Sequence, residues 1–211
     1  MPAVVQDEER STPRSALQRR TQPTWLLGTT GWATLLVLGL LVLIWQVVLT
    51  SQSHSDFCQD YIASLRLLQG QPPYQPLHLW PGYRACTMPI DYDIHPPFLM
   101  LFFAPLALLP KVPAFLIWGF LSLAAYLASG LLLLRALGWY SLRGVALFVA
   151  GSVLWEPLIE AEGIQNLGQV LLLLLVVAWL LERRGRAGWA GGMLGLATLM
   201  KLWPAAHVRP W

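Results

Sequence analysis

Residues 32–49 spell WATLLVLGLLVLIWQVVL, an apolar run in which Gln46 is the only strongly polar side chain. Together with residues 25–30, the run is long enough to cross a hydrocarbon core of roughly 30 Å at a helical rise of about 1.5 Å per residue. Four basic residues precede it, at Arg10, Arg14, Arg19 and Arg20. Basic residues favour the cytoplasmic side of a membrane. The stretch therefore predicts a first transmembrane helix with a cytoplasmic N-terminus.

The composition of the whole chain indicates the same class of protein. Of its 211 residues, 56% are hydrophobic and only 12% are charged, and the mean hydropathy is +0.54. Soluble domains carry about a quarter charged residues, and no soluble fold of this length has enough interior to hide so much apolar surface. The net charge of +3 is small and gives no reason to expect nucleic acid as a partner. We therefore expect an all-α integral membrane protein.

Five further apolar runs follow, at residues 96–109, 112–134, 144–155, 163–181 and 187–200. The first of these is too short to span a membrane comfortably and is interrupted by Pro105. We expect it to form a half-helix or a re-entrant segment rather than a crossing of its own.

The charges between the runs predict on which side of the membrane each connection lies. Residues 135–143 contain two arginines, residues 156–162 contain three glutamates, and residues 182–186 contain three arginines and one glutamate. If the run at 96–109 does not cross, these connections fall inside, outside and inside, as the positive-inside rule prefers. The sequence thus predicts five full crossings plus one short segment.

This interpretation divides the chain into three parts. Residues 1–23 are polar and are expected to form a disordered cytoplasmic tail. Residues 24–206 are expected to form the transmembrane domain, with an external loop at 51–95, and residues 207–211 a short tail. Because the chain stops abruptly at Trp211, we interpret this domain as truncated.

The external loop begins with a segment that has the pattern of an amphipathic helix. Apolar side chains recur there at helical spacing, at Phe57, Tyr61, Ile62, Leu65 and Leu68. Gly70 and the proline pair that begins at Pro72 end the pattern. We expect a helix that lies in the outer interface of the membrane.

Asp56 stands at the start of this segment and permits two interpretations. With Gln59 it has the spacing of a capping pair, which favours a purely structural role. A carboxylate at headgroup depth, beside a helix that contacts lipid tails, could also take a proton from an attacking hydroxyl. Asp60 lies one turn further on the same face and is a weaker candidate for that role.

Cys58 and Cys86 are the only cysteines, and both lie in the external loop. An oxidising compartment would allow a bridge between them, although two cysteines alone do not establish one. The histidines in and near the loop show no metal-ligand spacing, so we expect no metal site.

Lys201 follows a run of uncharged residues at 187–200. In the expected topology it approaches the outer leaflet, where its amine could contact a phosphate. It could equally well extend to the interface to keep its charge solvated.

Four short motifs occur along the chain in the order in which one known family carries them. The first is Ser55-Asp56-Phe57, followed by Tyr61, Ala63, Gly70 and Pro73-Tyr74. The second is His95-Pro96-Pro97-Phe98, followed by Ala104-Pro105-Leu106 and Leu109-Pro110. The third is Gly168-Gln169-Val170, and the fourth runs from Ala187-Gly188 through Gly195-Leu196-Ala197 to Lys201 and Pro204. Together they resemble the polyprenyl-phosphate-mannose-dependent mannosyltransferases of glycosyltransferase family 87.

This resemblance implies a multi-pass helical bundle of the GT-C type in the plasma membrane, with the active site in the external loop. It implies transfer of a sugar, usually mannose, from a polyprenyl-phosphate donor to a lipid or glycan acceptor, with inversion and without a cofactor. Asp56 matches the aspartate expected to act as the general base in such enzymes. His95 is expected to position the acceptor or the phosphate. The full set of residues expected to bind substrate is Asp60, Tyr61, Arg66, Tyr74, His95, Gln169 and Lys201.

Two other functions stay open at this point. A transporter component would place ionisable residues near the bilayer midplane, often within an internal repeat, whereas here the acids cluster in the external loop. An inactive, truncated membrane protein would insert without catalysing a reaction, because members of the family are longer and carry further helices.

Overall fold

The structure is a computed structural model that describes residues 28–49, 56–76, 79, 95–155, 157–159 and 165–201. The helices are α1 (Thr29–Leu49), α2 (Asp56–Leu68), α3 (Pro97–Ala107), α4 (Lys111–Ala136), α5 (Leu142–Leu154), α7 (Gly168–Arg183) and α8 (Ala187–Met200). No strand occurs within the described ranges, so the all-α class is confirmed for them. The tails expected at 1–23 and 207–211, and about half of the external loop, lie outside the described residues.

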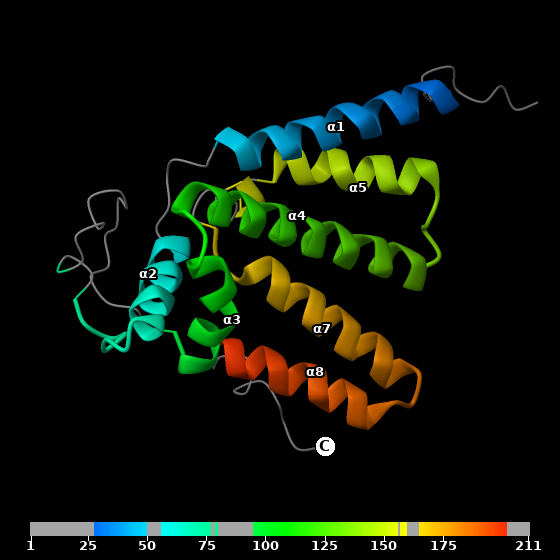
Figure 1. The fold of residues 1–211 in the computed structure, drawn as a ribbon. Coiled ribbons are helices and arrows are strands. Elements are labelled where there is room, and N and C mark those ends of the chain that lie inside the picture. Colours follow the sequence, from blue (N-terminus) through cyan, green and yellow to red (C-terminus); the bar gives the residue numbers. More distant parts are fainter. Residues whose placement is uncertain are drawn as a thin grey trace, which may run out of the picture.

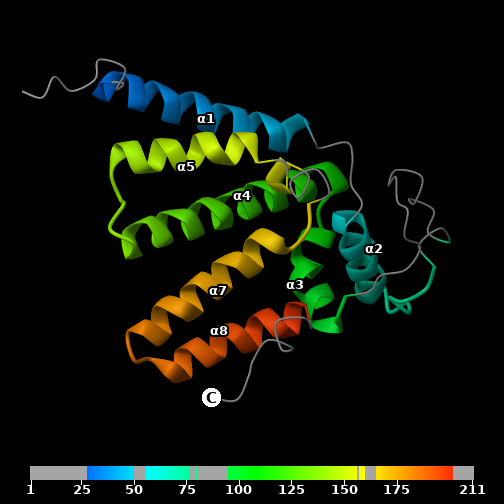
Figure 2. The same ribbon diagram turned by 180° about the vertical axis from the view of Figure 1, so that it is seen from behind.

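Five helices lie side by side, and successive ones along the chain run in opposite directions. Figures 1 and 2 show the helices side by side in the order α1, α5, α4, α7 and α8, with α2 and α3 gathered at one end. The neighbours α1 and α5 run in the same direction, and so do α4 and α7. α1 packs against α5, α4 against α7, and α7 against α8. The last residues of α1, α5 and α8 and the first residues of α4 and α7 therefore lie at the same end as α2. We call this the α2 end of the bundle.

Prolines determine where α3 begins and where the next helix starts. Pro96 has extended backbone, with φ −62° and ψ 152°, and Pro97 opens the helix, where a missing N–H group costs little. Pro110 is again extended before α4. The 11 residues of α3 extend about 16 Å at about 1.5 Å per residue. That is close to half of a hydrocarbon core of roughly 30 Å, so α3 cannot cross it alone, as the sequence predicts for residues 96–109.

Two groups of buried apolar side chains hold the helices together. The larger joins α2, α3, α4, α7 and α8, and its aromatic members are Phe57, Phe103, Phe115 and Trp118. We call these four the aromatic cluster. The Phe57 and Phe115 rings meet edge to face with centroids 5.3 Å apart, and those of Phe103 and Trp118 are 4.6 Å apart. Such pairs contribute about 0.5–1.5 kcal/mol beyond the burial of their surface. The smaller group joins α1, α4 and α5 around Val47.

α1 and α4 are the described helices that are both long and apolar enough to cross a membrane, with 21 and 26 residues. α1 exposes large apolar side chains along its length, among them Leu38, Leu41, Trp45 and Leu49. Water solvates such a surface poorly, whereas lipid tails suit it. α5, α7 and α8 have 13, 16 and 14 residues. The two long helices therefore indicate that the protein associates with a membrane.

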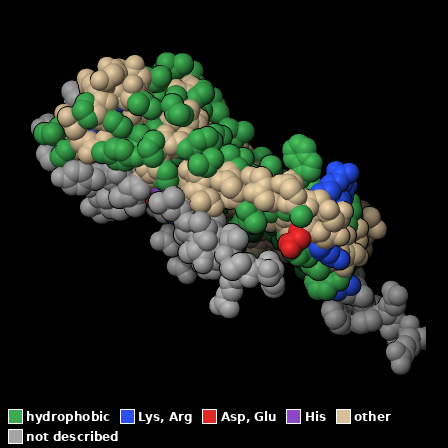
Figure 3. Space-filling model, turned by 90° about the horizontal axis from the view of Figure 1, so that it is seen from below, with side chains coloured by type: hydrophobic (Ala, Val, Ile, Leu, Met, Phe, Trp, Pro, Cys, Tyr) green, Lys and Arg blue, Asp and Glu red, His purple; other side chains and the backbone are tan. Residues whose placement is uncertain are grey.

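The end of the bundle opposite α2 is basic. Figure 3 shows Lys and Arg side chains gathered at this end. Arg143 stacks on Trp32 with its guanidinium carbon 5.5 Å from the ring centre, and Arg183 stacks on Trp179 at 4.9 Å. Tryptophan rings favour the headgroup zone of a bilayer and attract cations to their faces. The described helix ends and turns at this end carry Arg135, Arg143, Arg183, Arg184 and Arg186, together with Glu182.

A tight turn joins α4 to α5 at the basic end. Gly138 has a positive φ of 76°, which only glycine adopts without strain. The Ser141 hydroxyl accepts a hydrogen bond of 3.1 Å from the Gly144 N–H and so caps α5. A Cβ atom added to Gly144 would collide with the carbonyl oxygen of Trp139. The turn thus requires the smallest residue at two positions.

Gly144→Ala is expected to destabilise the fold by roughly 1–3 kcal/mol, because the new methyl group has no room beside a backbone carbonyl. Gly151→Ala, in the same helix, is the matched control, since no atom lies within 4 Å of a Cβ added there. Thermal unfolding of both variants in detergent makes the comparison. Equal unfolding temperatures for the two variants would contradict the turn described here.

Candidate functional site

α2 carries four of the residues that the sequence analysis assigned to the site. It begins at Asp56 and packs along α3, so the helix expected here is confirmed. Its apolar stripe was expected to face the membrane interface, yet Phe57 is fully buried in the aromatic cluster and Ile62 is 2% exposed. The reason is α3, which covers the apolar side of α2.

Asp56 is the first residue of α2 and is half-buried. A carboxylate at a helix N-terminus interacts favourably with the positive end of the helix dipole. Residues 50–55, which precede it, lie outside the described residues. The structure therefore places Asp56 at the edge of the α2 end, and both interpretations of its role stand.

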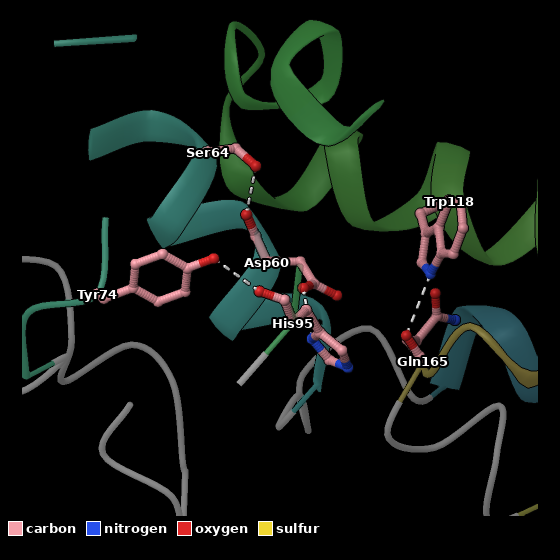
Figure 4. A network of polar contacts seen from close by, with 6 residues as sticks. All are labelled: Asp60, Ser64, Tyr74, His95, Trp118 and Gln165. Atoms are coloured by element: carbon pink, nitrogen blue, oxygen red, sulfur yellow. Dashed lines mark hydrogen bonds and ion pairs between the residues drawn. The ribbon is translucent and has the colours of Figure 1, made fainter. Parts of the chain in front are cut away.

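Asp60 and His95 form a buried ion pair at this end (Figure 4). His95 Nδ1 lies 2.8 Å from Asp60 Oδ1, and the two side chains are 7% and 2% exposed. The two side chains carry opposite charges when the imidazole is protonated. The Ser64 hydroxyl donates to the Asp60 carbonyl at 2.6 Å, and the Tyr74 hydroxyl donates to the His95 carbonyl at 3.0 Å. Backbone contacts therefore hold both members of the pair.

Tyr61 and Arg66 also donate hydrogen bonds to backbone carbonyls. The Tyr61 hydroxyl donates to the Leu109 carbonyl at 2.8 Å. The Arg66 guanidinium, 2% exposed, donates to the carbonyls of Gln75 and Pro76 at 2.6 and 2.9 Å. These bonds attach α2 to the segment after α3 and to its own following loop. Both side chains thus support the architecture of the site, and their contact with substrate stays a prediction.

Gln169 and Lys201 reach the same end of the bundle from other helices. Gln169 lies in the first turn of α7 and is 4% exposed. Lys201 follows the last residue of α8 and is half-buried. Because α7 packs on α4 and α8 packs on α3, both residues are held at the α2 end.

Gln165 is a feature of this end that the sequence analysis missed. It precedes α7 with a positive φ of 55°, which is uncommon for a residue with a side chain. Its carbonyl accepts a hydrogen bond of 3.1 Å from the Trp118 indole N–H (Figure 4). Its carboxamide lies where a Cβ of Gly119 would otherwise be. The only signal in the sequence was a polar pair, Gln165-Asn166, between apolar residues.

Cys58 is disulfide-bonded and fully buried in α2. Cys86 is the only other cysteine of the sequence and lies outside the described residues. A disulfide is typical of an oxidising compartment. In the described part of the chain, no group of three His, Cys, Asp or Glu residues could hold a metal ion.

Tyr61→Phe is expected to lower the free energy of unfolding by about 1 kcal/mol at neutral pH, because the Leu109 carbonyl loses its donor. Burial raises the pKa of Tyr61 above its ordinary value of 10.0. The contribution of the protonated phenol is therefore complete below that value and disappears as the pH rises through the raised pKa. Chemical denaturation over this pH range measures the difference from the wild type. Tyr140→Phe, exposed at the basic end, is the control, and an equal loss there would contradict the assignment.

The comparison with known protein families covers part of this site. Residues 94–208, more than half of the chain, match the model of glycosyltransferase family 87. The match begins just before His95 and includes Gln169 and Lys201, whereas α2 with Asp56 precedes it. No curated protein and no solved structure matches the chain. On the strength of the family match, the chain belongs to glycosyltransferase family 87.

Proposed function

We propose that this chain is a membrane-bound mannosyltransferase that moves mannose from a polyprenyl-phosphate donor to a hydroxyl of a lipid or glycan acceptor. The observation that carries the proposal is the family match over residues 94–208, since a glycosyltransferase needs a sugar donor and an acceptor. The four motifs add the donor class, because they resemble those of the polyprenyl-phosphate-mannose-dependent members. The proposed reaction uses no cofactor.

The helix arrangement supports a site on the outer face of the plasma membrane. α1, α4, α5, α7 and α8 alternate in direction, while α3 stays at the α2 end (Figure 1). Five crossings of a GT-C type bundle would put the described arginine-rich turns on one side, which the positive-inside rule makes cytoplasmic. The three shorter helices would be matched by local thinning of the bilayer. α2 would then lie at headgroup depth outside, where a lipid-linked sugar is presented.

Asp56 is the proposed general base. It is half-buried at the edge of this end, where an acceptor hydroxyl could approach it. The carboxylate takes the hydroxyl proton as the oxygen attacks the anomeric carbon from the side opposite the phosphate. The bond to the phosphate oxygen breaks, and the configuration at that carbon inverts. The phosphate is a good leaving group, so the site has to stabilise negative charge there more than it has to supply a proton.

Asp56→Asn is expected to lower the rate of mannose transfer by about a hundredfold or more, because general base catalysis contributes at least that factor. The measurement is transfer of labelled mannose from a polyprenyl-phosphate donor by the purified chain in lipid. Unfolding temperature and membrane insertion serve as controls for the fold. Transfer at the wild-type rate would remove Asp56 from the mechanism.

The orientation has its own test in intact cells. Gln69→Cys, exposed just after α2, should react with a membrane-impermeant thiol reagent, because that end is expected to face outward. Arg184→Cys, exposed in the turn between α7 and α8, should react only after permeabilisation. The reverse pattern would place α2 in the cytosol, away from any externally presented donor.

A further inference from the structure

The turn between α7 and α8 concentrates positive charge at the basic end of the bundle. Arg183, Arg184 and Arg186 are all exposed, and so is Glu182, the acidic residue beside them. The backbone of the turn is closed by a hydrogen bond of 2.9 Å from the Arg186 N–H to the Leu181 carbonyl, which is typical of a well-defined helix end. The three guanidinium groups are therefore presented together, from a backbone of defined shape.

The charge of this turn is not neutralised by the turn itself. Among the described residues, no ion pair joins Glu182 to any of the three arginines, and three arginines against one glutamate leave an excess of positive charge. Arg183 stacks on the Trp179 ring at 4.9 Å. Stacking uses the face of a guanidinium, so the N–H groups in its plane stay available to an acceptor. The turn can therefore offer several donors to one anionic group.

Two tryptophan rings flank these charges. Trp179 lies one turn before Arg183 in α7, and Trp189 lies in the first turn of α8 with 69% of its surface exposed. Figure 3 shows hydrophobic side chains beside the Lys and Arg side chains at this end. Because tryptophan favours the boundary between lipid tails and headgroups, the rings place the turn at that boundary in a membrane. The guanidinium groups then lie at the level of the lipid phosphates, whichever side of the membrane this end faces.

We propose that the α7–α8 turn is a binding site for the headgroup of an anionic phospholipid, whose phosphate contacts Arg183, Arg184 and Arg186. Planar guanidinium groups bind phosphate oxygens through paired hydrogen bonds, and bonds between charged groups are the stronger kind. A zwitterionic lipid carries its own cation, so the excess positive charge of the turn favours a lipid with a net negative charge. This inference goes beyond the proposed function and requires only that the basic end lies at a membrane surface.

The turn between α4 and α5 offers a comparison at the same end of the bundle. Its two arginines lie in different helices, and each stacks on an aromatic ring, Arg135 on Tyr140 at 4.4 Å and Arg143 on Trp32 at 5.5 Å. Their charges are therefore fewer than those of the α7–α8 turn and are separated by the whole turn. Removing them tests whether any loss of positive charge at this end has the same effect.

The test compares two lipids that differ in the net charge of the headgroup. Native mass spectrometry of the full chain in detergent measures the affinity of the first bound phosphatidylglycerol and of the first bound phosphatidylcholine. The wild type should prefer phosphatidylglycerol by roughly tenfold. The double variant Arg184→Gln/Arg186→Gln should lose most of this preference and keep the wild-type affinity for phosphatidylcholine. A folded double variant with the full preference, or a wild type with none, would overturn the inference.

Arg135→Gln/Arg143→Gln is the matched control, because it removes the same charge from the α4–α5 turn. It should keep the preference, and an equal loss there would reduce the effect to overall charge and overturn the site. Thermal unfolding shows whether each variant folds, and if the first double variant does not, Arg184→Gln alone decides, with a smaller loss expected.

A soluble headgroup separates a lipid from a free phosphate as the occupant. sn-Glycerol 3-phosphate, at the concentration of the lipid, should leave bound phosphatidylglycerol in place, because it lacks the acyl chains that hold a lipid beside the turn. Displacement of the lipid would assign the turn to soluble phosphates and overturn the proposed occupant. No sugar transfer enters these measurements, so their outcome is independent of the proposed function.

Discussion

The packing of α2 on the bundle through the aromatic cluster is the interaction on which the rest of the site depends. Phe57 reaches from α2 to Phe115 of α4, while Phe103 of α3 lies against Trp118 of α4. A helix of only 13 residues would be marginally stable alone in water. Because these rings hold it on α3 and α4, its polar side chains are fixed relative to the other helices.

The burial of α2 gives its two carboxylates different environments. Asp56 is at the start of the helix and half-buried, while Asp60 is enclosed and lies against His95. Two similar groups can then serve different purposes, because a ligand can reach the first more easily than the second. In the proposed function the first carboxylate acts on the acceptor.

Much of the fold could be predicted from the sequence. The runs at 32–49, 112–134 and 187–200 correspond to α1, α4 and α8, because a long apolar run has no favourable state except a helix with its backbone bonds satisfied. The start of α2 at Asp56 and the short α3 were also predicted, because polar capping residues and prolines mark the ends of helices. The run at 163–181 was placed too early, since α7 begins at Gly168.

The site was predicted less completely. Its residue types were identified, but spacing along a chain does not say what a side chain contacts across 35 or more residues. The sequence by itself determined an apolar, helical chain with arginine-rich connections between some of its apolar runs, since hydropathy and charge act locally. Only the tertiary structure decided that Asp60 pairs with His95, that Tyr61 and Arg66 hold backbone carbonyls, and that Gln165 packs on Gly119. Those choices depend on which helices meet, and helices meet through complementary shapes that no single segment contains.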